Sequence, residues 1–454
     1  MPLLSLPLEL FLLITEALGN EKDINALVQT CRQLYQNLNT HLYRYNVRNS
    51  QSSGLVYAAH TGEEAAVKKL LDEGGDPQTW YLEPPIVLAA IKGHIGVLKL
   101  LLENGAETYP QDTVHERSAL FWAAIGRNKE VVKLLLDGGA DPDPMDVESN
   151  TPLMMAADEG DIEMVKFLLD NGADADVESE HGDTALSRAA EAGREDIARL
   201  LLERGVCLTT KNQENGTAPL SAAAERGYTE IVKLLLQAGA STQARDWDGR
   251  TALGIAAAEL GCEGIVRLLL ANGADLESRD DSGYTPLAVA VESRNIETVK
   301  ILLDKGANIE ARDDTGSTPL AAAAANVCKE LVELLLQHGA DIETQDAGGS
   351  TPLASVTRKG DLEMALFLVE KGADIEARDE DGRTPLFIAA FFGHIYLVTL
   401  LLDRGASLDI RDSNGYTLLS VSKNEEVSNL LRGKGASIEA DDGGRTEADV
   451  VIVG

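Results

Sequence analysis

Aromatic side chains are scarce in this 454-residue chain, where Phe, Trp and Tyr together make up 4 % of the residues. Rings of this kind usually fill much of a globular core. Length alone would predict about three globular domains. With so few rings, the chain is better suited to a thin, continuous core in which Ala and Leu make most of the contacts.

Cysteine is also rare. The four cysteines, Cys31, Cys207, Cys262 and Cys328, show no CxxC spacing and no neighbouring histidine pattern. The common zinc and redox motifs are therefore excluded. We expect reduced thiols and, because disulfides are rare in reducing compartments, an intracellular location in the cytoplasm, the nucleus or both.

Long apolar runs are missing. The apolar stretch at residues 1–19 is interrupted by Pro7 and Glu9, and its longest unbroken run is Leu10–Ile14. No basic residue precedes it, so it does not resemble a secretory signal. No other segment approaches the roughly 18 apolar residues that cross a bilayer. We expect a soluble protein with no membrane partner.

Basic residues are fewer than acidic ones. The chain has 40 Lys and Arg and 74 Asp and Glu, which gives a net charge of −34. The first 50 residues are balanced, so the acidity lies in the rest of the chain. A surface this acidic excludes nucleic acid and anionic lipid as partners, since both need basic footprints. Two interpretations remain open: a surface that attracts a basic protein, or acidic loops that are only solvated.

Catalytic motifs are absent as well. The sequence has no Ser/His/Asp order, no GxxxxGK phosphate loop and no zinc-ligand spacing, which are the signals that would point to an active site. Its 41 glycines fall mostly at turns with a regular period. We expect no enzymatic activity, no cofactor and no metal.

What the sequence does contain is a recurring unit, clearest at residues 280–312. Thr285 can cap a helix with its hydroxyl, and Pro286 follows at the first helical position, where a missing N–H costs nothing. Residues 296–303 supply the apolar side of a second helix. Gly306 then ends that helix, because other L-residues lose about 1–2 kcal/mol in the left-handed conformation.

A helix pair of this size cannot bury both of its faces alone, so it must stack on copies of itself. The copies are present, because the final glycine recurs at intervals of 30 to 34 residues, which predicts about twelve units. These glycines are Gly75, Gly105, Gly139, Gly172, Gly205, Gly239, Gly273, Gly306, Gly339, Gly372, Gly405 and Gly435.

The 33-residue period, with starts such as Thr318-Pro319-Leu320 and endings such as Gly339-Ala340-Asp341, resembles the ankyrin repeat. The resemblance implies an all-α solenoid of helix-turn-helix units with β-turn or hairpin loops over residues 54–440, the first two and the last being irregular. Residues 441–454 would be an incomplete terminal repeat or a tail. In that family a Gly-His pair between the helices makes a structural hydrogen bond, the role we expect of His94 and His394.

Residues 1–45 lack the repeat, and their pattern, which starts with Leu-Pro, resembles the F-box, a short helical motif. The resemblance implies three short helices that dock on the Skp-type adaptor of a cullin-based ubiquitin ligase. The alternative is a helical cap that covers the apolar end of the stack. Residues 46–53 would be a short linker. Carried over by position, the adaptor-facing residues are Leu6, Pro7, Leu10, Ile14 and Leu27.

Target binding should fall on residues that the repeat itself does not need, at loop tips and on the first helix of each unit. Trp, Tyr and Arg are the side chains most enriched at binding hot spots. For the two phenylalanines, exposure and packing of one ring into the next repeat both remain open. The candidates are Trp247, Arg250, Tyr284, Arg383 and Tyr416 on tips, and Phe391 and Phe392 on a first helix.

Together these patterns predict the substrate-recognition subunit of a Skp/cullin/F-box-type ubiquitin ligase, monomeric on its own. Its N-terminal helices would bind the Skp-type adaptor and through it a cullin, and its repeats would bind a protein target, which the charge suggests is basic. The alternative is a non-enzymatic ankyrin scaffold whose N-terminal helices only cap the stack.

Overall fold

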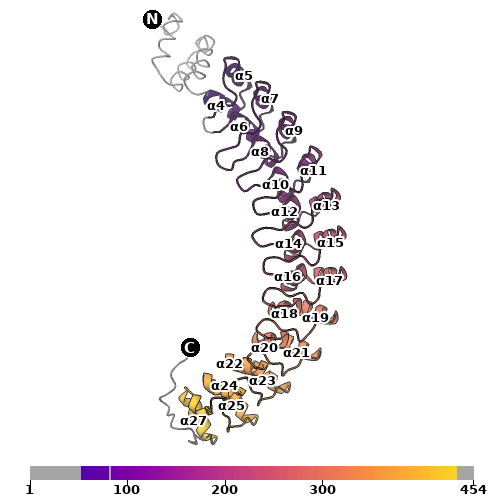
Figure 1. Cartoon of the computed structure of the whole chain (residues 1–454). Coiled ribbons are helices and arrows are strands. Elements are labelled where there is room, and N and C mark those ends of the chain that lie inside the picture. The colour runs from indigo at the N-terminus through magenta and orange to yellow at the C-terminus, as the bar shows by residue number, and fades with distance from the viewer. Residues whose placement is uncertain (1–52, 81–82, 437–454) are drawn as a thin grey trace, which may run out of the picture. The chain divides into compact units, whose positions relative to one another are not determined.

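The computed structural model describes residues 53–80 and 83–436. In these ranges the regular elements are 24 helices, α4 to α27, and no strand (Figure 1). The loops add three isolated antiparallel bridges, Gln111 with Ser118, Arg245 with Thr251, and Arg411 with Thr417. The predicted all-α class is confirmed, and the 24 helices form twelve pairs, in agreement with the predicted number of repeats.

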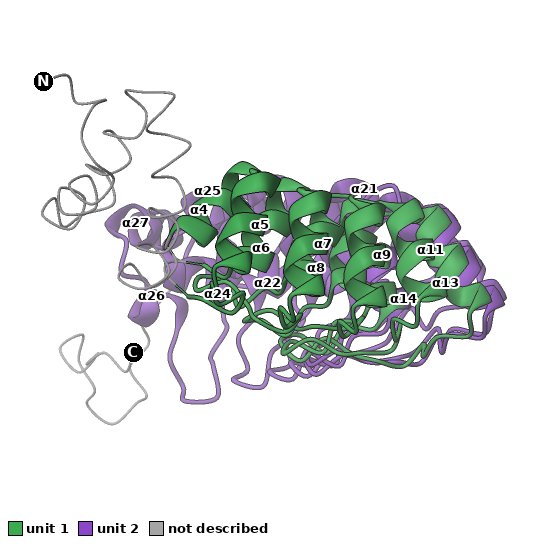
Figure 2. Ribbon diagram, turned by 90° about the horizontal axis from the view of Figure 1, so that it is seen from above, with its two compact units in different colours: residues 1–219 green, residues 220–454 purple. Residues whose placement is uncertain are grey.

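The chain divides into two compact units, residues 1–219 and 220–454 (Figure 2). In unit 1 the second helices follow one another in a row, with the loops gathered to one side of them. The first helices of unit 1 are α4 (Ser53–Thr61), α6 (Pro85–Lys92), α8 (Ala119–Ile125), α10 (Pro152–Glu159) and α12 (Ala185–Glu191). Its second helices are α5 (Glu64–Asp72), α7 (Ile95–Glu103), α9 (Lys129–Asp137), α11 (Ile162–Asp170) and α13 (Glu195–Glu203).

Unit 2 repeats the pattern, and its opening helix starts at Pro219, the residue before the boundary. The first helices there are α14 (Pro219–Glu225), α16 (Ala252–Ala258), α18 (Pro286–Glu292), α20 (Pro319–Ala325), α22 (Pro352–Lys359), α24 (Pro385–Phe392) and α26 (Leu418–Val421). The second helices are α15 (Thr229–Gln237), α17 (Glu263–Ala271), α19 (Ile296–Asp304), α21 (Lys329–Gln337), α23 (Leu362–Glu370), α25 (Ile395–Asp403) and α27 (Glu425–Gly433).

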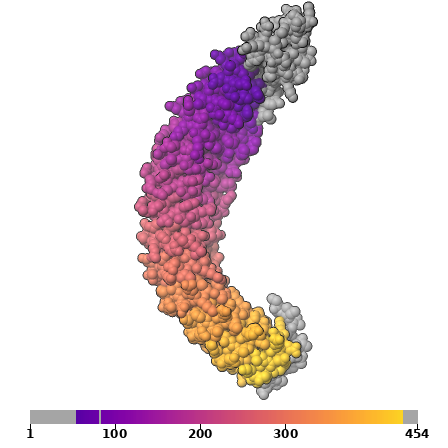
Figure 3. All heavy atoms as spheres, turned by 180° about the vertical axis from the view of Figure 1, so that it is seen from behind, coloured from indigo at the N-terminus to yellow at the C-terminus, as the bar shows by residue number. Residues whose placement is uncertain are grey.

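In neighbouring repeats, first helices pack against first helices and second helices against second helices. In unit 2, α18 contacts α16 and α20, while α19 contacts α17 and α21. Each repeat therefore buries its apolar side chains against the next one, and the space-filling view shows no gap between successive repeats inside a unit (Figure 3). The buried side chains are chiefly Ala, Leu and Val, and only two aromatic rings, Phe121 and Phe387, are among the largest that are fully buried.

The first helices begin as the sequence predicts. Thr285 has extended backbone, its side chain accepts a hydrogen bond from the N–H of Ala288, and Pro286 follows at the start of α18. The threonines at 151, 184, 251, 318, 351, 384 and 417 cap their helices in the same way. The cap satisfies one of the amides that a helix start leaves open.

The second helices end at a glycine with positive φ, such as Gly306 at +88°. The prediction of Gly75 for the first repeat was wrong, because the left-handed residue there is Gly74, with φ +87°. Gly74 donates to the carbonyl of Leu71 in the way that Gly105 donates to Leu102. Helices α5 and α7 have the same length of nine residues, so Gly74 is the equivalent of Gly105. The other eleven predicted glycines have positive φ.

Two local irregularities also match the sequence. The interval from Gly239 to Gly273 is 34 residues, one more than the usual 33. The extra residue follows α16 and leaves Glu259 extended, with ψ 131°, so the helix stops at Ala258 and Gly261 makes the turn. The last pair is shortened in its first helix, since α26 has only four residues. Both departures stay inside one repeat, and the neighbouring helices keep their contacts.

Several predictions concern residues outside the described ranges. The F-box-like residues Leu6, Pro7, Leu10, Ile14 and Leu27 lie there, as do residues 441–454 and Cys31. Within the described ranges, Cys207, Cys262 and Cys328 are free thiols. None of the helices in those ranges is long and apolar enough to cross a membrane.

Truncating Leu302 tests the stacked core. Its side chain is fully buried in α19, so Leu302→Ala should cost about 2–5 kcal/mol through lost contacts and a cavity. Leu260→Ala, at a residue 75 % exposed, is the matched control and should change little. Urea unfolding and hydrogen exchange in α19 would measure the effect; equal behaviour of the two variants would contradict the packing described here.

Candidate protein-binding surface

Six loops join the seven described helix pairs of unit 2, and each carries a tip turn organised by one aspartate. The Oδ1 atom of Asp280 accepts hydrogen bonds from the N–H of Ser282, at 3.0 Å, and of Tyr284, at 2.8 Å. Asp246 does the same for Asp248 and Arg250, and it is only 5 % exposed. The equivalent residues are Asp313, Asp346, Asp379 and Asp412. A carboxylate that holds backbone amides fixes the turn and the direction of the side chains next to it.

The tips are also joined to one another. The N–H of Asp281 donates to the carbonyl of Asp248, at 2.9 Å, and the N–H of Asp314 donates to Ser282, at 3.2 Å. Such close approach requires glycine at 283, because a Cβ there would lie 2.8 Å from the backbone nitrogen of Asp314 and φ is +77°. The tips of unit 2 therefore form a continuous hydrogen-bonded row.

A ladder of arginines runs beneath this row. The Nη1 atom of Arg279 donates to the carbonyl of Gly283 in its own tip, at 2.9 Å, and to the carbonyl of Arg312 in the next repeat. Arg312 bonds its own Gly316 and then Gln345. Gln345 continues the ladder with its amide, which donates to the carbonyl of Arg378 at 3.3 Å.

A second ladder is made of carboxylates. The Oε1 atom of Glu277 accepts from the N–H of Asn308 in the next repeat, at 2.8 Å, and Glu310 accepts from Asp341 at the same distance. Glu343 and Glu376 repeat the contact. Burial raises the pKa of Glu343, with Asp374 and Asp341 adding to the effect. The acidic loops are thus not only solvated, since their carboxylates accept backbone amides across the repeat boundaries.

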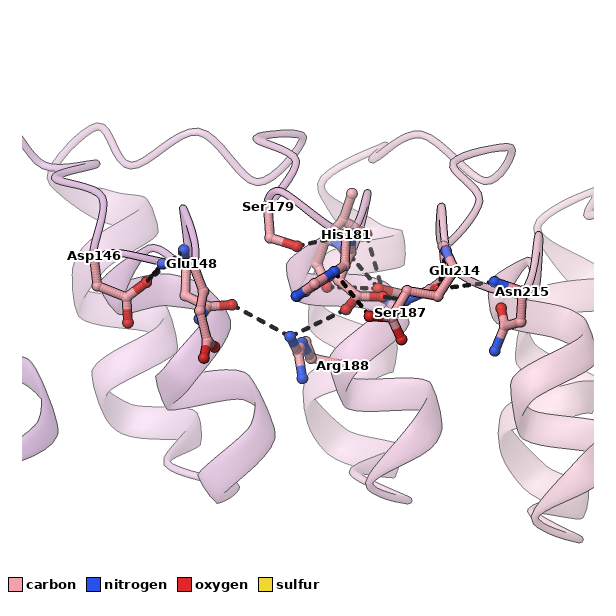
Figure 4. A network of polar contacts seen from close by, with 12 residues as sticks. Asp146, Glu148, Ser179, His181, Ser187, Arg188, Glu214 and Asn215 are labelled. Carbon is pink, nitrogen blue, oxygen red and sulfur yellow. Dashed lines mark hydrogen bonds and ion pairs between the residues drawn. The ribbon is translucent and has the colours of Figure 1, made fainter. Parts of the chain in front are cut away.

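In unit 1, other side-chain contacts between neighbouring turns take the place of part of the arginine and carboxylate ladders (Figure 4). Arg188 lies between two turns, where its Nη2 is 3.0 Å from Asp183 and donates to Asn150 at 3.3 Å. His181 Nδ1 lies 3.1 Å from the carboxylate of Glu214 in the following turn. Arg117 pairs with Asp146 of the next repeat at 3.0 Å. Neighbouring loops of unit 1 are therefore also held together.

The tip aspartate of the third repeat has a further role. Asp112 accepts from the N–H groups of Val114 and His115 and from Nε1 of Trp122, at 2.8 Å. Burial would raise the pKa of Asp112, but these hydrogen bonds outweigh it and hold the pKa below its usual value. The carboxylate therefore stays ionised and fixes the indole of Trp122 beside its own turn.

Comparison with known proteins identifies the repeat. The sequence model for "Ankyrin repeats (3 copies)" matches residues 55–146, 120–212, 207–280, 248–313, 272–346, 310–379 and 353–442. The chain belongs to the ankyrin-repeat family. Ankyrin repeats form protein–protein interaction domains, so this chain carries one.

Individual relatives share parts of the chain. The mouse "Ankyrin repeat and SAM domain-containing protein 6" is 37 % identical over 81 residues, which are 17 % of this chain and 9 % of that protein. The matched segment thus spans a small part of that relative. The crystal structure of the ankyrin repeat domain of Bcl-3, a member of the IkappaB family, is 31 % identical, with a TM-score of 0.44. It covers 48 % of this chain and all of its own.

Two of the predicted tip residues are held by their own ankyrin turn. Arg250 donates from Nε to the buried Asp246, at 2.8 Å, and its Nη2 lies 3.0 Å from Asp248. Burial lowers the pKa of Arg250, but the bond to Asp246 and the nearby carboxylates outweigh it and raise the pKa. Arg383 pairs with Asp379 and Asp381 in the same manner. Both guanidinium groups stabilise their turns, so their charge is already balanced.

The other tip candidates differ in exposure. Trp247 is 59 % exposed on the tip between Asp246 and Asp248. Tyr284 and Tyr416 are half-buried, and burial together with Asp313, Glu292 and Asp280 raises the pKa of Tyr284. Tyr284 and Arg250 line one small recess, so the fold brings these two candidates together.

Phe391 and Phe392 end α24 and are both partly exposed, at 38 % and 49 %. Their rings meet edge to face with centroids 5.1 Å apart, and Lys423 lies over Phe391 at 5.2 Å. Neither ring is buried in the neighbouring repeat, which decides between the two arrangements left open by the sequence. The pair forms a small aromatic patch on the repeat surface.

The histidine prediction is confirmed. Nε2 of His94 lies 3.1 Å from the carbonyl oxygen of His60 in the preceding repeat. His394 makes the same contact with Arg358, at 3.3 Å. Each ring therefore joins two repeats, as expected of a structural hydrogen bond.

Sequence reasoning missed a set of exposed apolar side chains in unit 1. These residues lie on the loops that follow α7 and α9, and an alignment with residues 275–280 would have revealed two of them. Tyr109 occupies the position equivalent to Glu277, and Met145 occupies the position equivalent to Arg279. The set is Tyr109, 71 % exposed, Val114, 70 %, Met145, 43 %, and Val147, 54 %.

The tip turns offer a direct test. Asp246→Ala should cost about 1–3 kcal/mol, because two backbone amides lose their buried acceptor. Asp248→Ala is the control, since its side chain is 72 % exposed and takes part only in a surface pair, worth under about 1 kcal/mol. Urea unfolding and exchange of the amides at 248 and 250 would measure both; a larger loss in Asp248→Ala would refute the assignment.

Proposed function

We propose that this chain is the substrate-recognition subunit of a Skp/cullin/F-box-type ubiquitin ligase. Residues 1–45 would dock on the Skp-type adaptor, and the ankyrin repeats would hold a protein target. The chain would position the target and would not itself transfer ubiquitin.

The observation that carries the proposal is the Leu-Pro pattern of the N-terminal segment, which lies outside the repeats. The matches to the ankyrin family begin at residue 55, so the segment with Leu6, Pro7 and Leu10 precedes the matched repeats. Its charge is also balanced, unlike that of the rest of the chain. A separate N-terminal module followed by repeats suits a protein that joins two partners.

The repeats suit the second task because their loops are held in place before any target arrives. Tip bonds, arginines and carboxylates join successive repeats of unit 2. A preorganised surface loses less conformational entropy on binding. By its name, the mouse relative also combines ankyrin repeats with a different domain, an arrangement of the same kind as the one proposed.

Adaptor capture tests the proposal. Tagged wild-type protein should retain a purified Skp-type adaptor, whereas Leu6→Ala/Pro7→Ala should lose it, because the apolar contacts at the start of the motif are removed. Pro2→Ala/Leu4→Ala changes the same segment outside the motif and should still bind. Binding can be followed by pull-down and titration calorimetry.

Failure of the wild-type protein to retain any Skp-type adaptor would refute the ligase proposal and leave the scaffold, in which the N-terminal helices only cap the stack. The scaffold makes a different prediction. Deleting residues 1–45 would then lower the unfolding midpoint of the first repeats.

Replacing Trp247 tests the target surface. Trp247→Ala should weaken target binding by at least about tenfold, as expected for a hot-spot side chain, and leave the unfolding midpoint unchanged, since the ring is 59 % exposed. Glu380→Ala alters the equivalent tip position and is the control. Quantitative mass spectrometry of captured proteins would compare the three; identical capture by wild type and Trp247→Ala would remove this residue from the site.

A further inference from the structure

The loops after α7 and α9 in unit 1 depart from the regular ladders. In unit 2 the space between neighbouring loops is crossed by a carboxylate, as from Glu277 to Asn308, and by an arginine, as from Arg279 to Arg312. The residues at the same two places between the second and third repeats are Tyr109 and Gln111. Tyr109 thus puts a neutral phenol, a weaker acceptor, where the regular loops have a carboxylate.

One crossing is retained and the other is lost. Nε2 of Gln111 donates to the carbonyl of Met145, at 3.1 Å, which keeps the two loops side by side. Tyr109 is instead 71 % exposed and lines the space between the loops. Where the carboxylate would lie, a cavity of about 320 Å³ opens between the loops. We call it the Tyr109 cavity; it is lined by Thr108, Tyr109, Gln111, Ser118, Ala140, Asp141, Asp143, Pro144 and Met145.

The acidic wall of the Tyr109 cavity consists of Asp141 and Asp143. Oδ2 of Asp143 accepts from the N–H of Asp174, at 2.9 Å, but its Oδ1 is buried without a hydrogen-bond partner. Burial raises the pKa of Asp143, and the charges of Asp141 and Asp174 add to the effect. In the described part of the chain, no Lys, Arg or His forms an ion pair with either wall carboxylate.

The lining of the cavity also includes apolar side chains. Tyr109 and Met145 line the cavity and remain largely accessible, and Val114 and Val147 are exposed on the adjoining tips. The N–H of Val147 donates to the carbonyl of His115, at 3.0 Å, so the two tips are neighbours. A cavity lined by an aromatic ring, a thioether and two carboxylates suits a ligand with an aliphatic stem and a cationic end.

We propose that the Tyr109 cavity takes the side chain of one lysine or arginine from a protein partner. The stem lies between Tyr109 and Met145, the cation lies at Asp141 and Asp143, and neighbouring apolar residues of the partner contact Val114 and Val147. The cavity volume suits a single side chain rather than a helix. This inference rests on the proposed protein-binding function and gives the partner's chemistry, whichever module the N-terminal segment proves to be.

A metal ion fits the cavity less well. Divalent cations such as Ca²⁺ take six to eight oxygen ligands, and the described residues contain no group of three or more His, Cys, Asp or Glu placed to hold a metal. An amine or guanidinium needs fewer acceptors and gains from the apolar wall.

Small cations can test the site without knowledge of the partner. Full-length protein labelled with ¹³C at the methionine methyl groups would be titrated at pH 7 with n-butylammonium and n-butylguanidinium. The Met145 signal, assigned with Met145→Leu, should shift and saturate, while that of buried Met364 in unit 2 should not move. Neutral n-butanol should give no saturable shift, because the cation supplies the selectivity.

Two variants locate the cation. Asp143→Asn keeps an oxygen acceptor for the amide of Asp174 but removes the charge, and it should weaken binding of n-butylammonium by about tenfold. Asp137→Asn removes the same charge from an exposed residue at the end of α9 and should leave the affinity unchanged. Equal weakening in the two variants, or an equal response to n-butanol, would overturn the proposal.

A peptide pair separates protein side chains from free amines. The capped pentapeptide Ala-Ala-Lys-Ala-Ala should shift the same Met145 signal, and its glutamine counterpart should not. Binding of n-butylammonium without any effect of the lysine peptide would overturn the assignment to a protein side chain. None of these measurements involves the adaptor, so their failure is distinct from failure of the ligase proposal.

Discussion

Burial of aliphatic side chains between neighbouring repeats is the interaction on which the rest of this molecule depends. A pair of short helices has an apolar stripe on each member and too little mass to cover both, so each stripe is covered by the next pair. Leu302 and Val299 in α19 are completely buried although the helix has only nine residues. Loops that join such helices acquire fixed positions only because the helices beneath them are stacked.

The loops then add their own order, and this explains the composition of the chain. Three acidic positions of the loop each accept backbone amides: Asp275 within its own loop, Glu277 across to the next repeat, and Asp280 inside the tip. Much of the charge of −34 is therefore a by-product of architecture repeated many times. The field that results still favours cationic partners and disfavours polyanions.

The proposed cation site lies where this scheme is interrupted. Arg250 and Arg383 look like binding residues in the sequence, but each is paired with the carboxylates of its own turn. Tyr109 and Met145 were not predicted as binding residues from the sequence. They occupy the positions of Glu277 and Arg279 in the ladders, and both line a cavity. A departure that removes a contact between repeats leaves unpaired groups and exposed surface, which a partner can use.

The sequence by itself determined the repeat, its helix boundaries and its capping residues, because these depend on interactions within a few residues: Thr285 with Ala288, or Gly306 with Leu303. The glycine of the first repeat was misplaced by one position, because the tandem Gly74-Gly75 offers two candidates and only the hydrogen bonds of the helix end distinguish them. Which side chains are free to bind was decided only by the tertiary structure. Their neighbours lie a whole repeat away in sequence, as Glu277 and Asn308 do, and stacking alone brings such residues into contact.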